Sequence, residues 1–132
     1  KNSKMNKPTF IIGSIYCGVA VMLGAFGAHA LKDLLSPESL QSFQTAVQYQ
    51  FSHGLAILIV GILYAQYPKR SLLNVGRFFS AGIICFSGSL YLLTFLKLMK
   101  INFHPAIGLI TPLGGLLMIL GWFSLTWTFL RK

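Results

Sequence analysis

The stretch "KPTFIIGSIYCGVAVMLGAFGAHALK" (residues 7–32) decides how the whole chain is interpreted. Between its two lysines lie 24 residues without a single Asp, Glu, Lys or Arg. About 20 consecutive apolar residues in an α-helix cross a lipid bilayer, so this stretch predicts a membrane-spanning helix over residues 9–31. Its apolar run is longer than the roughly 7 to 15 residues of a secretory signal peptide, and we therefore expect the helix to be retained.

Charged side chains divide the remainder of the chain in the same way. Further apolar segments extend over residues 50–67, 73–96 and 104–130. The composition agrees, because 10% of the residues are charged and 55% are hydrophobic, whereas a soluble domain carries roughly 25% charged residues. The sequence predicts an all-α integral membrane four-helix bundle, formed as one transmembrane domain over residues 1–132.

The basic residues indicate an orientation in the membrane. One side of the predicted bundle collects Lys1, Lys4, Lys7, Lys69, Arg70, Arg77, Arg131 and Lys132, and the other collects Lys32, Lys97 and Lys100. Since cytoplasmic loops are enriched in Lys and Arg, we expect both termini in the cytoplasm. The net charge of +9 does not indicate nucleic-acid binding, because these residues are separated by apolar runs instead of clustering on one face.

The segment between the first two spans has the features of a helix start. Ser36 is a good N-cap, Pro37 suits the first helical position, and Glu38 places an acid in the first turn. Apolar residues then recur mostly every three or four positions, with glutamines between them. This pattern predicts a short amphipathic helix at the outer interface, either separate from the second span or continuous with it.

Small residues and one proline carry expectations about packing. Pairs of glycines seven residues apart suit close, left-handed helix crossings in membranes: Gly54 and Gly61, Gly108 and Gly115, Gly114 and Gly121. Gly82, Cys85 and Ser89 share one face of the third span. Thr111-Pro112 predicts a kink in the fourth span, or alternatively an unwound ligand-binding point. Cys17 lies in the middle of an apolar run, as Cys85 does, and we expect both to be reduced.

The three histidines are the most distinctive polar residues, and the predicted topology places all of them near the outer surface. A structural network, a proton or ion pathway, and a metal or haem site are the three alternatives. Their spacing matches no short metal motif, so no metal and no other cofactor is predicted. Candidates for a polar network or ligand site are His29, His53, His104, Glu38, Gln48, Tyr49, Gln50 and Thr111.

Four ordered motifs resemble the YwdK/YgdD-like family of small bacterial membrane proteins. They are "GAFGAHALK" (24–32), "TAVQYQFSHGLAIL" (45–58), "FSGSLYLL" (86–93) and "ITPLGGLLMILGW" (110–122). The resemblance implies a four-span protein of the bacterial plasma membrane, in a family catalogued as a domain of unknown function. It implies no catalytic residue, substrate or cofactor.

The sequence contains no common enzyme motif, such as Gly-x-Ser-x-Gly, His-Glu-x-x-His or a phosphate loop. We therefore expect a non-catalytic protein of the bilayer that supports membrane integrity or assembles with itself, as a homo-oligomer, or with other membrane proteins. The alternative is a small channel or transporter for an ion or small solute that uses the outer His/Gln cluster.

Overall fold

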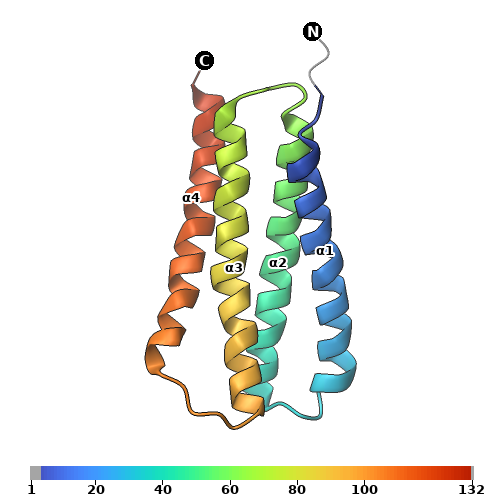
Figure 1. Ribbon diagram of the computed structural model, residues 1–132, viewed down its shortest axis with the longest axis vertical. Helices are drawn as coiled ribbons and strands as arrows, with labels where there is room; N and C mark the ends of the chain where they lie inside the picture. Colours follow the sequence, from blue (N-terminus) through green and yellow to red (C-terminus); the bar gives the residue numbers. More distant parts are fainter. Residues whose placement is uncertain (1–3, 132) are drawn as a thin grey trace.

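The computed structural model describes residues 4–131 and has four long helices side by side (Figure 1). They are α1 (Lys7–Phe26), α2 (Pro37–Leu63), α3 (Arg70–Leu98) and α4 (Ile110–Leu130); a π-helical turn η1 (Gly27–Leu31) follows α1, and a 3-10 turn η2 (Pro105–Leu109) precedes α4. With these short turns, four segments are long and apolar enough to cross a membrane. The predicted all-α, four-span fold is confirmed.

The helices pack in chain order, α1 on α2, α2 on α3 and α3 on α4. Figure 1 shows α1 and α4 on the two sides, with both chain termini and the α2–α3 connection at one end of the molecule. We call this the terminal end. The connections from α1 to α2 and from α3 to α4 lie at the opposite end. Of the eight basic residues expected on one side, Lys1 and Lys132 lie outside the described residues.

α1 begins at a side-chain cap and ends in a wider turn. The Asn6 Oδ1 atom accepts hydrogen bonds from the Thr9 backbone N at 3.0 Å and from the Thr9 hydroxyl at 2.7 Å. These contacts satisfy a backbone N–H that has no partner within the helix. At the other end, Gly27–Leu31 adopts π-helical geometry, which changes the angular position of the residues that follow Phe26.

α2 begins where the sequence predicts a helix start. Ser36 is the N-cap and its hydroxyl accepts a hydrogen bond from the Ser39 backbone N at 3.2 Å, with Pro37 and Glu38 in the first turn. The amphipathic segment is continuous with the second span, so the second helix begins at Pro37 and not near residue 50. The alternative in which the interfacial helix is separate from the second span was wrong, because the helical hydrogen bonds continue without interruption from Ser36 to Leu63.

The predicted kink in the fourth span was also wrong. α4 begins at Ile110, so Pro112 lies in its first turn. The first four N–H groups of a helix have no helical partner, and a proline there removes no hydrogen bond. The chain changes from 3-10 to α geometry at Leu109–Ile110, just before Thr111-Pro112, and the α-helix that follows is continuous to Leu130.

The two outer contacts, which we call the glycine seams, bring helix backbones close together. In the α1–α2 seam, a Cβ added to Gly13 would lie 2.5 Å from the Leu58 backbone N, and one added to Gly61 would lie 2.8 Å from the Phe10 backbone N. In the α3–α4 seam, a Cβ at Gly114 would overlap the Phe86 backbone N. Only hydrogen fits at these positions.

Two of the three predicted glycine pairs lie in these seams. Gly54 and Gly61 face α1, whereas Gly114 and Gly121 face α3. The expectation for Gly108 and Gly115 was wrong, since Gly108 has nothing near its Cβ position and Gly115 has only ordinary contact with one ring.

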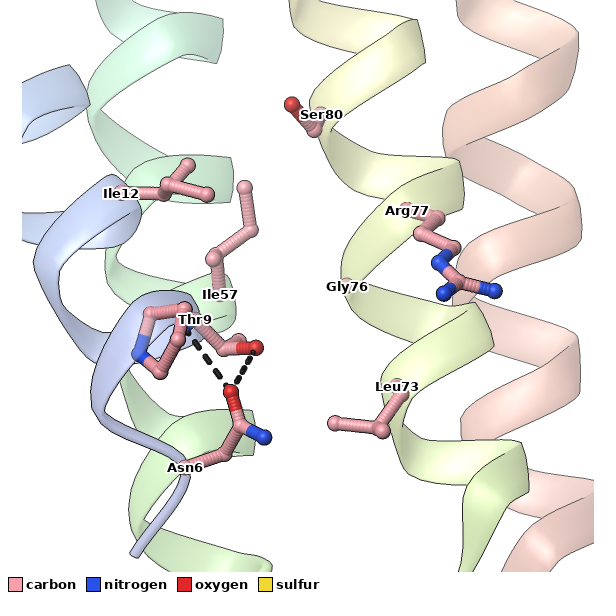
Figure 2. A pocket seen from close by; sticks show the side chains of 9 residues that line it. Asn6, Thr9, Ile12, Ile57, Leu73, Gly76, Arg77 and Ser80 are labelled. Carbon is pink, nitrogen blue, oxygen red and sulfur yellow. Dashed lines mark hydrogen bonds between the residues drawn. The ribbon is translucent and has the colours of Figure 1, made fainter.

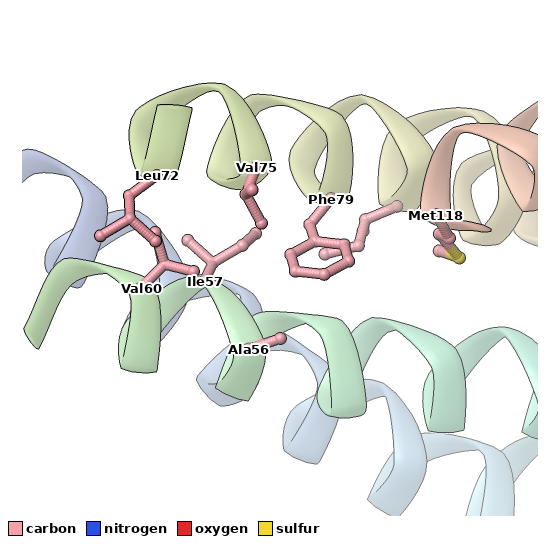
Figure 3. Close-up of a cluster of buried hydrophobic side chains, with 8 residues drawn as sticks. Ala56, Ile57, Val60, Leu72, Val75, Phe79 and Met118 are labelled. Atoms are coloured by element: carbon pink, nitrogen blue, oxygen red, sulfur yellow. The ribbon is translucent and has the colours of Figure 1, made fainter. Parts of the chain in front are cut away.

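The central contact between α2 and α3 is filled by large side chains. Figure 3 shows these residues pointing toward one another: Ala56, Ile57 and Val60 from α2, Leu72, Val75 and Phe79 from α3, and Met118 from α4. Ile83 completes the cluster. Phe79, Leu72 and Val75 are fully buried, so the core of the bundle lies in this central seam.

Candidate functional site

The polar residue that joins the most helices is Gln50 of α2, which is buried. Its Nε2 atom donates to the Tyr16 carbonyl of α1 at 2.9 Å, and its Oε1 atom accepts from the Tyr91 hydroxyl of α3 at 2.8 Å. An amide has both donors and an acceptor, so one side chain connects α2 to both neighbouring helices.

His53 lies one helical turn further along α2 and joins it to α4. The Trp122 Nε1–H donates to His53 Nε2 at 3.1 Å, while His53 Nδ1 lies 2.8 Å from the Tyr49 carbonyl. Because the indole can only donate, His53 Nε2 must accept, which places the imidazole proton on Nδ1. The ring is thereby held as a neutral tautomer with both nitrogens occupied.

Aromatic rings surround the imidazole. Phe79 and Trp122 meet it edge-on, with centroids 5.4 and 5.8 Å away. Tyr49 stacks at 5.9 Å from His53 and, on its other side, at 4.5 Å from Phe86 of α3. His53 is therefore packed among aromatic rings as well as hydrogen-bonded through both of its nitrogens.

Hydroxyl groups make further links between helices. Tyr16 and Ser80 connect α1 to α3 at 2.7 Å. Ser87 donates to the Ala46 carbonyl of α2 at 2.7 Å. Ser89 donates to the Phe86 carbonyl, so its oxygen accepts the Thr111 proton from α4 at 2.6 Å. We call the contacts of Gln50, His53 and these hydroxyls the interhelical polar network.

Four of the predicted candidates lie outside this network. Glu38 is exposed in the first turn of α2, and Gln48 is exposed beside a groove between α1 and α2. His29 is exposed in the π-helical turn. His104 is exposed and caps the 3-10 turn, its Nδ1 accepting from the Ala106 backbone N at 3.1 Å.

The three histidines do not converge, because His29 and His104 are exposed while His53 is buried among α2, α3 and α4. The face of α1 that carries Gly18, Met22 and Ala25 is also exposed. Within residues 4–131, His, Cys, Asp and Glu form no group of three that could hold a metal ion.

The buried polar side-chain atoms of the network are all hydrogen-bonded. Over the part of the chain that the structure describes, every buried side-chain nitrogen or oxygen has a hydrogen-bond partner. A buried polar group without a partner is costly, particularly where no water is present. The arrangement therefore stabilises helix–helix contacts through polar groups that bond to one another or to backbone carbonyls of neighbouring helices.

A separate cavity of about 310 Å³ lies at the terminal end between α1, α2 and α3. Figure 2 shows Asn6, Thr9 and Ile12 of α1 on one side, with Leu73, Gly76 and Ser80 of α3 on the other. The Asn6 Oδ1 atom already accepts hydrogen bonds from Thr9. The interhelical polar network reaches this cavity through Ser80, which bonds to Tyr16, whereas Gln50 and His53 do not line it.

Sequence reasoning missed the partners that complete the network, namely Tyr16, Ser80, Ser87, Ser89, Tyr91 and Trp122. Tyr91 and Trp122 could have been recognised as candidates, because a hydroxyl or indole N–H within a membrane span needs an acceptor. The sequence alone does not show which neighbouring helix each of these side chains contacts.

The helices, their apolar lengths and the connected interior define a small polytopic membrane protein. A family model described as "Protein of unknown function (DUF423)" matches residues 23–115. A UPF0382 membrane protein of Staphylococcus aureus (strain bovine RF122 / ET3-1) is 41% identical over 118 residues, covering 87% of this chain and 88% of that protein.

Other relatives have similar coverage. A UPF0382 membrane protein of Staphylococcus epidermidis (strain ATCC 12228 / FDA PCI 1200) is 39% identical over 90% of this chain and 92% of its own length. The UPF0382 membrane protein YwdK of Bacillus subtilis (strain 168) is 38% identical over 88% of this chain and 90% of its own length. No solved structure matches the chain significantly. The chain belongs to the DUF423 (UPF0382) family, as its resemblance to YwdK indicated.

Proposed function

We propose that this protein is a non-catalytic component of the bacterial plasma membrane that supports membrane integrity or assembles with itself or with other membrane proteins. The observation that carries the proposal is the interhelical polar network, in which Gln50 and His53 join one helix to another. Side chains committed to such contacts stabilise a rigid body in the membrane.

The outer helices provide the surface for assembly. In their most apolar windows α1 and α4 are each only 17% buried within the protein. Large apolar side chains such as Met22 and Phe123 are at least 70% exposed. Lipid covers such faces in a bilayer, and another membrane helix that packs well can replace the lipid.

A flux experiment separates this proposal from a channel or transporter. The purified protein is placed in liposomes, and the fluxes of protons, potassium and a small solute are measured for the native chain, His53→Ala and His104→Ala. We expect all three chains to match empty liposomes. The proposal would be overturned by a saturable or ion-selective flux through the native chain. Such a flux would be lost in His53→Ala and kept in the exposed control His104→Ala.

Assembly is tested by cross-linking in native membranes. A short lipid-soluble cross-linker should produce species larger than the monomer, containing either second copies or other membrane proteins. Recovery of monomer only, under conditions where a known membrane dimer is cross-linked, would contradict the assembly role.

The proposed orientation places both termini in the cytoplasm. It is supported by eight basic residues expected on that side against three on the other, and by the shared position of the termini and the α2–α3 connection (Figure 1). In intact cells a membrane-impermeant maleimide should label Ser36→Cys and spare Gln66→Cys. If Gln66→Cys were labelled and Ser36→Cys were not, the proposed orientation would be wrong, and the opposite one would hold.

A further inference from the structure

A groove runs between α3 and α4 at the terminal end. It consists of two adjoining hollows of about 400 and 350 Å³ that share Asn74 and Phe78. Near the end of the molecule, Ser71, Ser124 and Trp127 line it, and toward the bilayer centre Ala81 and Leu117 do so. We call this the α3–α4 groove; both hollows are lined mainly by apolar side chains, and the outer hollow also carries Ser71, Asn74 and Ser124.

Arg77 lies beside this groove without an acidic partner. Figure 2 shows its side chain leaving α3 toward α4. It lines the inner hollow with Leu117 and also borders the cavity between α1, α2 and α3. Its guanidinium makes one hydrogen bond in the described part of the chain, from Nη1 to Asn74 Oδ1 at 3.2 Å. A guanidinium has five N–H donors, so most of the hydrogen-bond donors of Arg77 remain available to a ligand.

The chain itself cannot neutralise this charge. Its only two acidic side chains, Asp33 and Glu38, lie at the opposite end, in and after the α1–α2 connection. A charge on a membrane helix is costly unless it is paired or reaches the interface. No acidic side chain of the chain lies near Arg77, which leaves its guanidinium free to pair with an anionic group from the surrounding membrane.

Neighbouring basic residues increase the positive potential but are engaged elsewhere. Lys69 Nζ donates to the Thr128 and Arg131 carbonyls at 3.1 and 3.2 Å. The Arg131 guanidinium lies 5.4 Å from the centroid of Trp127. Arg77 is thus the basic side chain that faces the groove, and the residues around it favour an anion over a neutral ligand.

The position of Arg77 along α3 is compatible with a phospholipid ligand. It is seven residues into α3, or about 10 Å along the axis from its start, and a long basic side chain can extend from there toward the membrane interface. Phe78, Ala81 and Leu117 continue the groove toward the bilayer centre, where an acyl chain would contact them. Basic pockets between membrane helices bind anionic headgroups.

We propose that the α3–α4 groove binds an anionic phospholipid, with the Arg77 guanidinium on its phosphate and one acyl chain along Phe78, Ala81 and Leu117. This inference does not depend on the scaffold function. The apolar wall distinguishes a phospholipid from free phosphate, which would leave that wall unoccupied.

The test measures which lipid stays on the purified protein. The full chain in detergent is mixed with equal amounts of phosphatidylglycerol and phosphatidylcholine that carry the same acyl chains, and native mass spectrometry counts each bound lipid. The variants are Arg77→Gln, Ala81→Phe and the control Lys97→Gln, which removes one positive charge at the opposite end. Circular dichroism confirms that each variant keeps its helices.

The native chain should retain phosphatidylglycerol in preference to phosphatidylcholine. Arg77→Gln should lower that preference about fivefold, the expected effect of one basic contact, while Lys97→Gln leaves it unchanged. Ala81→Phe should lower the amount of both lipids by filling the groove. An unchanged preference in Arg77→Gln, an equal loss in Lys97→Gln, or a second copy of the chain retained in place of lipid would overturn the proposal. Arg77 is exposed, so its substitution tests the idea even if Ala81→Phe disturbs the fold.

Discussion

The glycine seams and the central seam hold helices together in different ways. In the central seam Ile57, Leu72 and Phe79 fill the space between α2 and α3 with side chains. In the outer seams the backbones themselves meet, at Gly13 and Leu58 on one side and at Gly114 and Phe86 on the other. The same bundle thus contains a side-chain core and two backbone contacts.

This difference shows which substitutions the protein tolerates. Lipid is as apolar as a leucine side chain, so helices in a membrane associate through close packing and hydrogen bonds. A side-chain core can lose a methyl group at modest cost, since its neighbours partly adjust. A backbone contact cannot adjust in this way, because adding one carbon forces two whole helices apart.

The largest effect is expected for Gly114→Ala, because its Cβ would overlap the Phe86 backbone of α3. We expect the free energy of unfolding to fall by about 3 kcal/mol, the upper part of the range for overpacking. The matched control is Gly115→Ala, which meets only a ring atom at 3.8 Å and should change little. Reversible unfolding in mixed micelles with sodium dodecyl sulfate measures both. Equal losses in the two variants would contradict the α3–α4 seam.

A somewhat smaller effect is expected for Gly13→Ala in the α1–α2 seam. Its Cβ would lie 2.5 Å from the Leu58 backbone N, which is a slightly less severe overlap than that of Gly114 with Phe86. We expect a loss of about 2 kcal/mol. Gly18→Ala, with nothing within 4 Å of its Cβ, should be neutral or gain up to about 1 kcal/mol from helix propensity. The same assay measures the free energy of unfolding of both variants.

In the central seam, Ile57→Val should cost only about 1 kcal/mol. Ile57 is 1% exposed, and the loss of one buried methylene there leaves a small space that neighbouring side chains partly fill. Ile59→Val, on the exposed face of the same helix, is the control and should have no measurable effect. A loss from Ile57→Val as large as that from Gly114→Ala would remove the distinction between the two kinds of seam.

The sequence predicted the spans because charges punctuate a membrane chain directly. It also predicted the start of α2, since Ser36-Pro37-Glu38 meets three local requirements of a helix N-terminus. Local chemistry was sufficient for both features, and neither depends on which helix packs against which.

Features that depend on helix rotation could not be predicted in this way. Gly108/Gly115 and Gly114/Gly121 both have the spacing of a packing face, yet only the second pair faces α3. In the same manner Gly18 and His29 lie on a face of α1 that points outward, while His53 points inward to Trp122. Periodicity identifies a face, but the partner helix selects which face is buried.

The central claim is that interior polar side chains hold helices together, and the Gln50–Tyr91 hydrogen bond tests it most directly. The free energy of unfolding is measured for the native chain, Gln50→Leu, Tyr91→Phe and the double variant, with Tyr67→Phe as an exposed control. We predict a coupling of about 0.6 kcal/mol or more between Gln50 and Tyr91, the average for hydrogen bonds between membrane helices, and none between Gln50 and Tyr67. Additive losses in the Gln50–Tyr91 cycle would contradict the claim.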